Sequence, residues 1–284
     1  FSRCVNSALI TADSSIAGGI VARIHDWTII EDCLNTGMIV SIDQSNVGEV
    51  YDRYKTDNLP YKTVTYNGQE YKVKTLSSDL NNLTSSWDDE YGGIVGNALN
   101  SVIRRCANFG SIQTPETHTG GIAGKANGCY IEYCLNNFTA PSNVCGLVGM
   151  DSFYSNQIKS CLDMSDHTFL EGTTGDIANV TNCYTLQSGH SGDVLQSVTE
   201  AQLPTGEVCA MLGEGWQQNF GVDPFPVPGH RGFYNARTLN NEYGTVCLPF
   251  PLKSDANMRY YTFSGVTDKN VNTEVSFNYV DELP

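Results

Sequence analysis

Charge is scarce in this sequence, and basic residues are scarcer still. Charged residues make up 17 % of the 284 positions, whereas about a quarter is usual in a soluble domain. Lys and Arg number 16 against 31 Asp and Glu, which gives a net charge of −15. An acidic chain repels nucleic-acid phosphates and anionic membrane surfaces, so we expect neither as a partner. No apolar run approaches the roughly 18 residues that a membrane-spanning helix needs.

The motifs of the common enzyme classes are missing as well. The sequence has no His-Glu-x-x-His zinc motif, no Gly-x-Ser-x-Gly nucleophile motif and no phosphate-binding loop ending in Lys-Ser or Lys-Thr. No Cys-x-x-Cys pair or Cys/His cluster has the spacing of metal ligands. We therefore expect no catalytic residue, no metal site and no cofactor. Hydrophobic residues, at 40 %, are numerous enough for a substantial core and argue against disorder.

What the sequence does contain is an internal repeat of two alternating signatures. The first is a glycine pair, or a close variant, with small apolar residues, and it begins at Gly18, Gly92, Gly120, Cys145 and Gly175. The second is a cysteine preceded at three residues by an apolar residue; its cysteines are Cys4, Cys33, Cys106, Cys134, Cys161 and Cys183. The period is near 28 residues, as between Cys106 and Cys134, with one insertion in 40–91.

A period of this length fits helical solenoids, leucine-rich repeats or β-solenoids. Each unit is rich in Gly, Ile, Val, Thr and Asn and lacks a 3.6-residue apolar stripe, which favours strands over helices. Cys33, Asn35 and Gly37 fall at even offsets and share one face of a strand, whereas Ile30 falls at an odd offset. A bend between Ile30 and Cys33 is needed if both point inward. We predict an all-β fold, a parallel β-helix (β-solenoid) with coils about 4.8 Å apart.

The six repeat cysteines would stack in a column inside this solenoid. We interpret them as reduced, buried thiols that act as small apolar residues, because parallel Cβ vectors one coil apart are wider than disulfide geometry prefers. Disulfides among the ten cysteines, or a metal site, are the alternatives. Asn stands two residues after four of the six cysteines. It is either part of a stacked amide ladder or a turn residue that leads into the following Gly, and both roles are structural.

The alternating Gly-Gly-Ile-Val-Gly and Ile-x-x-Cys-x-Asn-x-Gly pattern resembles the GLUG repeat of bacterial cell-surface and secreted proteins. The resemblance covers about residues 1–185 without the insertion. Segments 199–203, 216–221 and 243–250 also resemble sequences that follow such repeats in surface proteins of gut Bacteroidetes. The resemblance implies a Bacteroidetes-type adhesin that is exported, either to the cell surface or outer membrane or into the medium. It is specific for architecture rather than activity, since the repeat also accompanies unrelated catalytic domains.

The insertion contains a predicted β-hairpin over residues 61–75, with Asn67 and Gly68 as its two-residue turn. Pairing Tyr66 with Gln69 places an apolar set on one face, which we expect to pack against the solenoid: Val64, Tyr66, Tyr71 and Val73. The opposite face, which contains Thr63, Thr65, Glu70 and Lys72, would face water.

The same insertion is the candidate ligand site, because specificity in repeat proteins usually comes from what departs from the repeat. It is rich in aromatic side chains, on which the apolar faces of sugar rings can stack. The candidates that flank the hairpin or lie on its polar side are Tyr51, Tyr54, Tyr61 and Trp87. Packing of these rings without a ligand role is the alternative.

The remaining boundaries follow from where the repeat ends. Residues 1–194 would form the solenoid, and residues 195–230 a segment that covers its end coil. In that segment Ser197 and Glu200 predict a capping box for a short helix that ends at Gly213. Residues 231–284 show strand-like alternation, which we interpret as the truncated start of a β-sandwich.

Together these observations predict a non-catalytic exported surface protein for adhesion, whose partner is a glycan or a host surface protein. A carbohydrate-active β-helix enzyme, either a polysaccharide lyase or a hydrolase, is one alternative. It is disfavoured because no position of the repeat consistently carries Asp or Glu. A structural stalk that displays a further domain is the other alternative.

Overall fold

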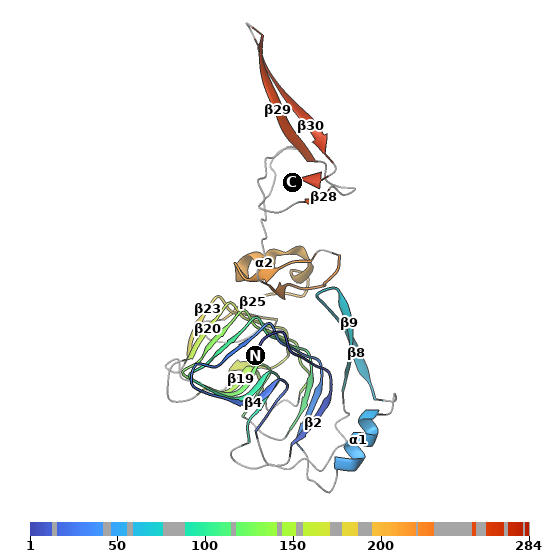
Figure 1. Ribbon diagram of the computed structural model, residues 1–284, viewed down its shortest axis with the longest axis vertical. Helices are drawn as coiled ribbons and strands as arrows, with labels where there is room; N and C mark the ends of the chain where they lie inside the picture. Colours follow the sequence, from blue (N-terminus) through green and yellow to red (C-terminus); the bar gives the residue numbers. More distant parts are fainter. Residues whose placement is uncertain are drawn as a thin grey trace. The chain divides into compact units, whose positions relative to one another are not determined.

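The chain divides into two compact units in the computed structural model, Phe1–Ala236 and Arg237–Pro284. The structure describes residues 1–12, 16–41, 47–55, 59–75, 89–114, 118–140, 144–151, 156–170, 178–186, 195–219, 221–229, 252–253, 260–269, 272–280 and 282–283. The first unit contains the repeat and is a parallel β-solenoid (Figure 1). This confirms the predicted fold class.

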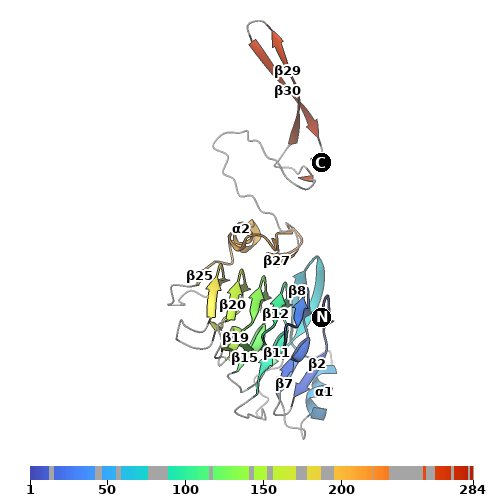
Figure 2. The same cartoon turned by 60° about the vertical axis from the view of Figure 1, so that its left-hand side comes forward.

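Four parallel sheets form the walls of the solenoid, and strands of successive coils lie side by side in each of them (Figure 2). The five-stranded sheet consists of β5 (Ile29–Glu31), β12 (Val102–Arg104), β17 (Tyr130–Glu132), β20 (Asn156–Lys159) and β23 (Ala178–Thr181). The seven-stranded sheet consists of β1 (Val5–Asn6), β6 (Leu34–Asn35), β13 (Ala107–Asn108), β18 (Leu135–Asn136), β21 (Leu162–Asp163), β24 (Tyr184–Thr185) and β25 (Gln196–Ser197).

The other two walls contain the remaining strands of each coil. The three-stranded sheet consists of β2 (Leu9–Ala12), β7 (Met38–Ser41) and β14 (Ser111–Gln113). The eight-stranded sheet contains the glycine signatures in β3 (Ala17–Gly18), β4 (Val21–Ile24), β10 (Tyr91–Gly92), β11 (Val95–Leu99), β15 (Thr119–Gly120), β16 (Ala123–Asn127), β19 (Cys145–Asp151) and β22 (Thr168–Leu170). Equivalent repeat residues pair directly, as Ile30 with Ile103 and Ile103 with Ile131.

A sharp corner separates each isoleucine from its cysteine, as the odd offset predicted. The residue immediately before every repeat cysteine is in the left-handed region, with φ between 50° and 56°: Arg3, Asp32, Arg105, Tyr133, Ser160 and Asn182. This single residue turns the chain from the five-stranded to the seven-stranded sheet. Ile103 and Cys106 are both fully buried as a result.

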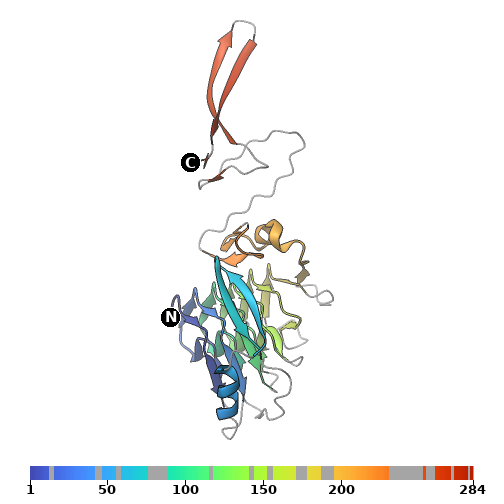
Figure 3. The ribbon, with the colours of Figure 1, turned by 90° about the vertical axis from the view of Figure 1, so that its right-hand side faces the viewer.

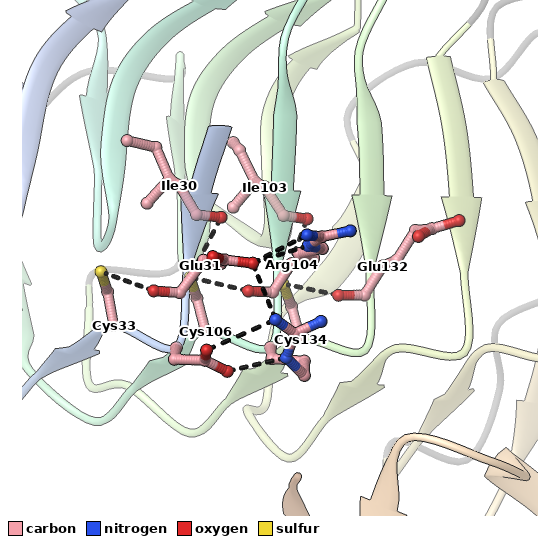
Figure 4. A network of polar contacts seen from close by, with 10 residues as sticks. Ile30, Glu31, Cys33, Ile103, Arg104, Cys106, Glu132 and Cys134 are labelled. Atoms are coloured by element: carbon pink, nitrogen blue, oxygen red, sulfur yellow. Dashed lines mark hydrogen bonds and ion pairs between the residues drawn. The ribbon is translucent and has the colours of Figure 1, made fainter. Parts of the chain in front are cut away.

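The cysteine column lies in the main core, as predicted. Five of its six members are buried, Cys4 in the first coil is partly buried, and all are free thiols in the structure. The Sγ of Cys106 lies 3.4 Å from the carbonyl oxygen of Arg104 and 3.9 Å from that of Ile30 (Figure 4). Cys134 repeats this arrangement one coil further on. Each thiol thus donates a weak hydrogen bond to a carbonyl near the corner, and burial raises the pKa of Cys106.

Beside the thiols runs a row of side-chain amides, and both roles considered for the Asn occur together. Asn35 Nδ2 donates to Asn108 Oδ1 (2.9 Å), and Asn108 Nδ2 donates to Asn136 Oδ1 (3.0 Å). The Oδ1 atoms of Asn35 and Asn108 also accept the backbone N–H two residues on, from Gly37 and Gly110 (both 3.1 Å). The row starts at Asn6 in the first coil. It therefore satisfies buried polar groups of successive coils along the core.

The amide row explains the second glycine of each glycine pair. A Cβ added to Gly93 would overlap the amide of Asn108, and one added to Gly121 would overlap that of Asn136. The two sequence signatures are therefore two halves of one contact, in which a side-chain amide packs against a bare Cα.

The outer surface of the seven-stranded sheet is also apolar, since the residue between Cys and Asn points outward there. The buried members of this outer row are Leu34, Ala107, Leu135, Leu162 and Tyr184. Part of the row is covered by the hairpin of β8 (Tyr61–Tyr66) and β9 (Gln69–Lys74). Its predicted turn at Asn67 and Gly68 and the pairing of Tyr66 with Gln69 are confirmed.

The segment after β25 also covers this outer row, rather than only closing the end coil. It contains η2 (Leu203–Thr205), α2 (Glu207–Leu212) and the antiparallel pair β26 (Trp216–Gln217) and β27 (Val227–Pro228). Trp216 is fully buried, and its Nε1 donates to the carbonyl oxygen of Ser160 (2.8 Å). Phe225 packs on Phe109, which lies two coils before the coil of Ser160, with ring centroids 5.6 Å apart.

The predicted capping box at Ser197 and Glu200 is wrong. Ser197 ends β25, and α2 begins only at Glu207, after Gly206, without a side-chain cap. Strand pairing with β24 holds Ser197 in extended backbone, so it cannot begin a helix. The predicted end at Gly213 is confirmed, since its N–H donates to the carbonyl oxygen of Cys209.

The described residues of the second unit form two antiparallel pairs. Strand β29 (Tyr260–Lys269) pairs with β30 (Asn272–Val280), and β28 (Leu252–Lys253) pairs with β31 (Glu282–Leu283). This agrees with the strand-like alternation expected there. The assignment to a β-sandwich stays a prediction.

Candidate functional site

The insertion adds a helix and the hairpin to one side of the solenoid (Figure 3). Helix α1 (Val47–Lys55) buries Val50 against Met38 and Val40 of β7, with Tyr54 packed at the edge of the same cluster. The hairpin is fixed by apolar contacts of Val64, Tyr66 and Val73 with the outer row. Both elements thus present one face to the solenoid and leave side chains of the other exposed, Tyr51 and Tyr61 among them.

Polar contacts also anchor the hairpin on its inner side. Lys62 Nζ donates to the carbonyl oxygen of Asn137 (2.7 Å), and burial lowers the pKa of Lys62 to about 8. Ser111 Oγ donates to the carbonyl oxygen of Lys74 (2.6 Å). The hairpin is therefore held at several points, and its outer face is a rigid surface rather than a free loop.

Two of the predicted ligand-binding tyrosines are exposed on these elements. Tyr51 on α1 is 47 % exposed, and Tyr61 on β8 is 52 % exposed. A lysine Nζ lies over each ring, Lys55 at 4.4 Å from the Tyr51 centroid and Lys72 at 5.0 Å from the Tyr61 centroid. These rings offer apolar area to solvent next to a positive charge.

Tyr54 is placed differently and contributes to the anchoring of α1. Its hydroxyl donates to the carbonyl oxygen of Ser7 in the first coil (2.7 Å), and partial burial raises its pKa. Lys74 Nζ lies 4.9 Å from its ring centroid and donates to its carbonyl oxygen (2.7 Å). Tyr54 therefore has a structural role, and its ligand role stays a prediction. Trp87, the fourth candidate, lies outside the described residues.

A second polar cluster lies at the corner of the five-stranded sheet (Figure 4). Arg104 and Arg105 each form an ion pair with Glu31 at 2.8 Å, and Arg105 also pairs with Asp32 at 2.7 Å. The hydrogen bond from Arg104 holds the pKa of Glu31 below its ordinary value. With both carboxylates paired, this cluster joins two coils and offers no group poised for acid–base catalysis.

The buried carboxyl of Asp163 occupies the amide position in a later coil. Its Oδ1 accepts hydrogen bonds from Asn136 Nδ2 (3.0 Å) and from the hydroxyl of Ser165 (2.8 Å). Its Oδ2 has no hydrogen-bond partner in the described part of the chain. Burial, the largest cause, raises the pKa of Asp163 to about 7. Because the group is fully buried in the core, it does not face a substrate.

Trp27 is an exposed ring that the sequence reasoning did not single out. It is 76 % exposed and, like Asp26, has a positive φ. Four residues separate Ile24 from Ile29, whereas three separate the equivalent Ala98 and Val102 one coil later. An alignment of the coils in the sequence would have revealed this extra residue, which is the signal for the altered corner at Trp27.

Comparisons with known proteins give little beyond the fold. No family model matches the chain, and no curated protein matches it. A solved structure from Bacteroides ovatus, described as a "putative immunoglobulin A1 protease", is similar with a TM-score of 0.44 and 16 % sequence identity. The match covers 80 % of this chain and 69 % of that one. A likeness of this size gives no information about activity, and the solenoid assignment rests on the strand pairing itself.

The described residues contain neither a candidate membrane-spanning helix nor a candidate metal cluster. No described helix is long and apolar enough to cross a bilayer. Nor does any group of three or more His, Cys, Asp or Glu side chains in the described ranges have the arrangement needed to hold a metal ion.

Proposed function

We propose that this chain is a non-catalytic, exported surface protein that binds a glycan or a host surface protein through the outer face of its insertion. The assignment to GLUG-repeat adhesins of Bacteroidetes type belongs to this proposal and is supported by the two repeat signatures. One observation carries the binding role. The exposed rings of Tyr51 and Tyr61 lie on elements outside the repeating coil, and those elements are anchored from the opposite side.

Rigid anchoring favours this role physically. A ring on a preorganised surface loses little conformational freedom when it stacks on a sugar, so more of the contact energy becomes affinity.

The test is binding to a panel of neutral and acidic polysaccharides and of host glycoproteins, measured by calorimetry or on an array. Tyr51→Ala and Tyr61→Ala should weaken binding while the melting temperature stays near that of the wild type. Tyr130→Ala is the matched control, since Tyr130 is 46 % exposed on the five-stranded sheet, away from the insertion. If Tyr130→Ala weakened binding as much as Tyr51→Ala and Tyr61→Ala do, the site would be refuted. Release of saccharide products from any polymer would instead favour the carbohydrate-active enzyme.

A further inference from the structure

Three tyrosine–lysine pairs lie on the insertion, and two of them, Tyr51–Lys55 and Tyr61–Lys72, are exposed. Besides the pairs Tyr51–Lys55 and Tyr61–Lys72, Lys74 Nζ lies 4.9 Å from the ring centroid of Tyr54. Each pair places an ammonium group over the face of an aromatic ring. The candidate site is thus a surface of alternating rings and positive charges, which we call the tyrosine–lysine surface.

The pairs are contiguous rather than scattered. Tyr61 and Lys74 are direct partners in the register of the hairpin, so their side chains lie on the same face. Lys74 reaches from this face to Tyr54 on α1. Tyr51, Tyr54 and Lys55 follow one another at i, i+3 and i+4 along the helix, which places them on one side of it.

Ion pairing distinguishes the lysines of this surface from the arginines of the solenoid corner. No ion pair is formed by Lys55, Lys72 or Lys74 among the described residues, whereas Arg104 and Arg105 at the corner of the solenoid are both paired with acids. Five of the 16 basic residues of the whole chain fall in the short stretch 53–74. The acidic side chains described as exposed on the same elements are Asp52 and Glu70.

The net charge of −15 does not prevent an anion from binding here. At physiological ionic strength charges are screened over about 8 Å, so the groups next to a bound ligand decide the local attraction. They include the ammonium groups of Lys55 and Lys72, which lie 4.4 Å and 5.0 Å from the ring centroids.

We infer that the ligand of the tyrosine–lysine surface is an anionic glycan with carboxylate-bearing sugar units, an inference that rests on the proposed binding function. The apolar face of a sugar ring stacks on Tyr61 or Tyr51, and the carboxylate accepts hydrogen bonds from the neighbouring Lys72 or Lys55. A neutral sugar would satisfy the rings but leave the ammonium groups unused. The charge complementarity therefore selects acidic polymers over neutral ones with the same backbone.

The experiment compares polygalacturonate with its carboxyl-reduced form, which has the same backbone without the charge. Wild-type protein should bind polygalacturonate at least about tenfold more tightly than the reduced polymer, and added salt should weaken this binding. The double variant Lys55→Gln/Lys72→Gln should lose that preference, and Lys72→Arg should retain it. Lys159→Gln is the matched control, because Lys159 is exposed on the five-stranded sheet far along the chain from the insertion.

The outcomes separate this inference from the proposed function. Equal binding of both polymers, or a preference that survives the double lysine substitution, overturns the anionic ligand while the ring-dependent binding stands. A loss of preference in Lys159→Gln as well would also overturn it, because the effect would then come from net charge. If the protein binds neither polymer and no member of the panel, both the anionic ligand and the proposed binding function are overturned. A melting temperature near that of the wild type shows that the lysine variants are folded, since their ammonium groups make no ion pair in the described chain.

Discussion

Replacing Asp163 by Asn should stabilise the protein, and the gain should be largest at alkaline pH. Asp163 occupies the position at which four earlier coils have an Asn, and its carboxyl is completely buried. In the wild type, Oδ2 has no hydrogen-bond partner among the described residues, so nothing there compensates a negative charge. Burial accordingly raises the pKa of this carboxyl from 3.8 to about 7.

The sign and size of the effect follow from proton binding. Between pH 3.8 and about 7 the folded protein holds a proton on Asp163 that the unfolded chain has released. The free energy of unfolding therefore falls as pH rises through this window, by about 1.4 kcal/mol per pH unit and by about 4 kcal/mol in all. An Asn at position 163 does not titrate, so the variant lacks this loss. The difference in free energy of unfolding between the variant and the wild type should therefore grow by about 3 kcal/mol between about pH 5 and about pH 8.5.

Urea unfolding of the two proteins at both pH values measures this difference directly. All other titrating groups are shared, so they cancel when the wild type is subtracted from the variant. A stability difference that is the same at both pH values would refute the raised pKa. A variant less stable than the wild type at about pH 8.5 would show that the amide row does not accept an Asn in this coil.

Three substitutions and one thiol titration test the rest of the architecture. Ile103→Asp should lower the free energy of unfolding by about 4 kcal/mol or more, because it buries an unpaired charge in the main core; soluble protein of near wild-type stability would contradict the coil assignment. Gly121→Ala should be destabilising, since its Cβ would overlap Asn136, whereas Gly48→Ala in α1 meets nothing and should gain up to about 1 kcal/mol. Thiol titration should find at least six free thiols after denaturation and slow reaction of the buried column before it; a count below six would disprove the reduced column.

The sequence allowed the solenoid to be predicted because its signals are repeated and local. Six cysteines in register defined the coil, and the odd offset of Ile30 required the corner that Asp32 makes with its left-handed backbone. The hairpin could be predicted for a similar reason, since Asn-Gly between alternating strands specifies both turn and register.

What the sequence could not show depends on contacts between distant segments. The start of α2 was misplaced because pairing with β24 keeps Ser197 extended. The packing of Phe225 on Phe109 has no local signal. The candidate rings were found from composition, but their separation into exposed Tyr51 and Tyr61 and anchored Tyr54 depends on the backbone of Ser7 and on Lys74.

The direction of the amide row limits how a protein of this kind can change its length. Each Nδ2 donates toward the next coil and each Oδ1 accepts from the previous one, so every coil presents the same two half-bonds to its neighbours. When one whole coil is added or removed, each Nδ2 donor again meets an Oδ1 acceptor of the neighbouring coil. A gain of a few residues between Cys and Asn would instead turn the amide out of the row and leave two buried groups unpaired. Within the row, the chain can therefore lengthen or shorten only by whole coils. Irregular additions are confined to the loops between the walls, as in the insertion that follows β7 and in the one extra residue of the Trp27 corner.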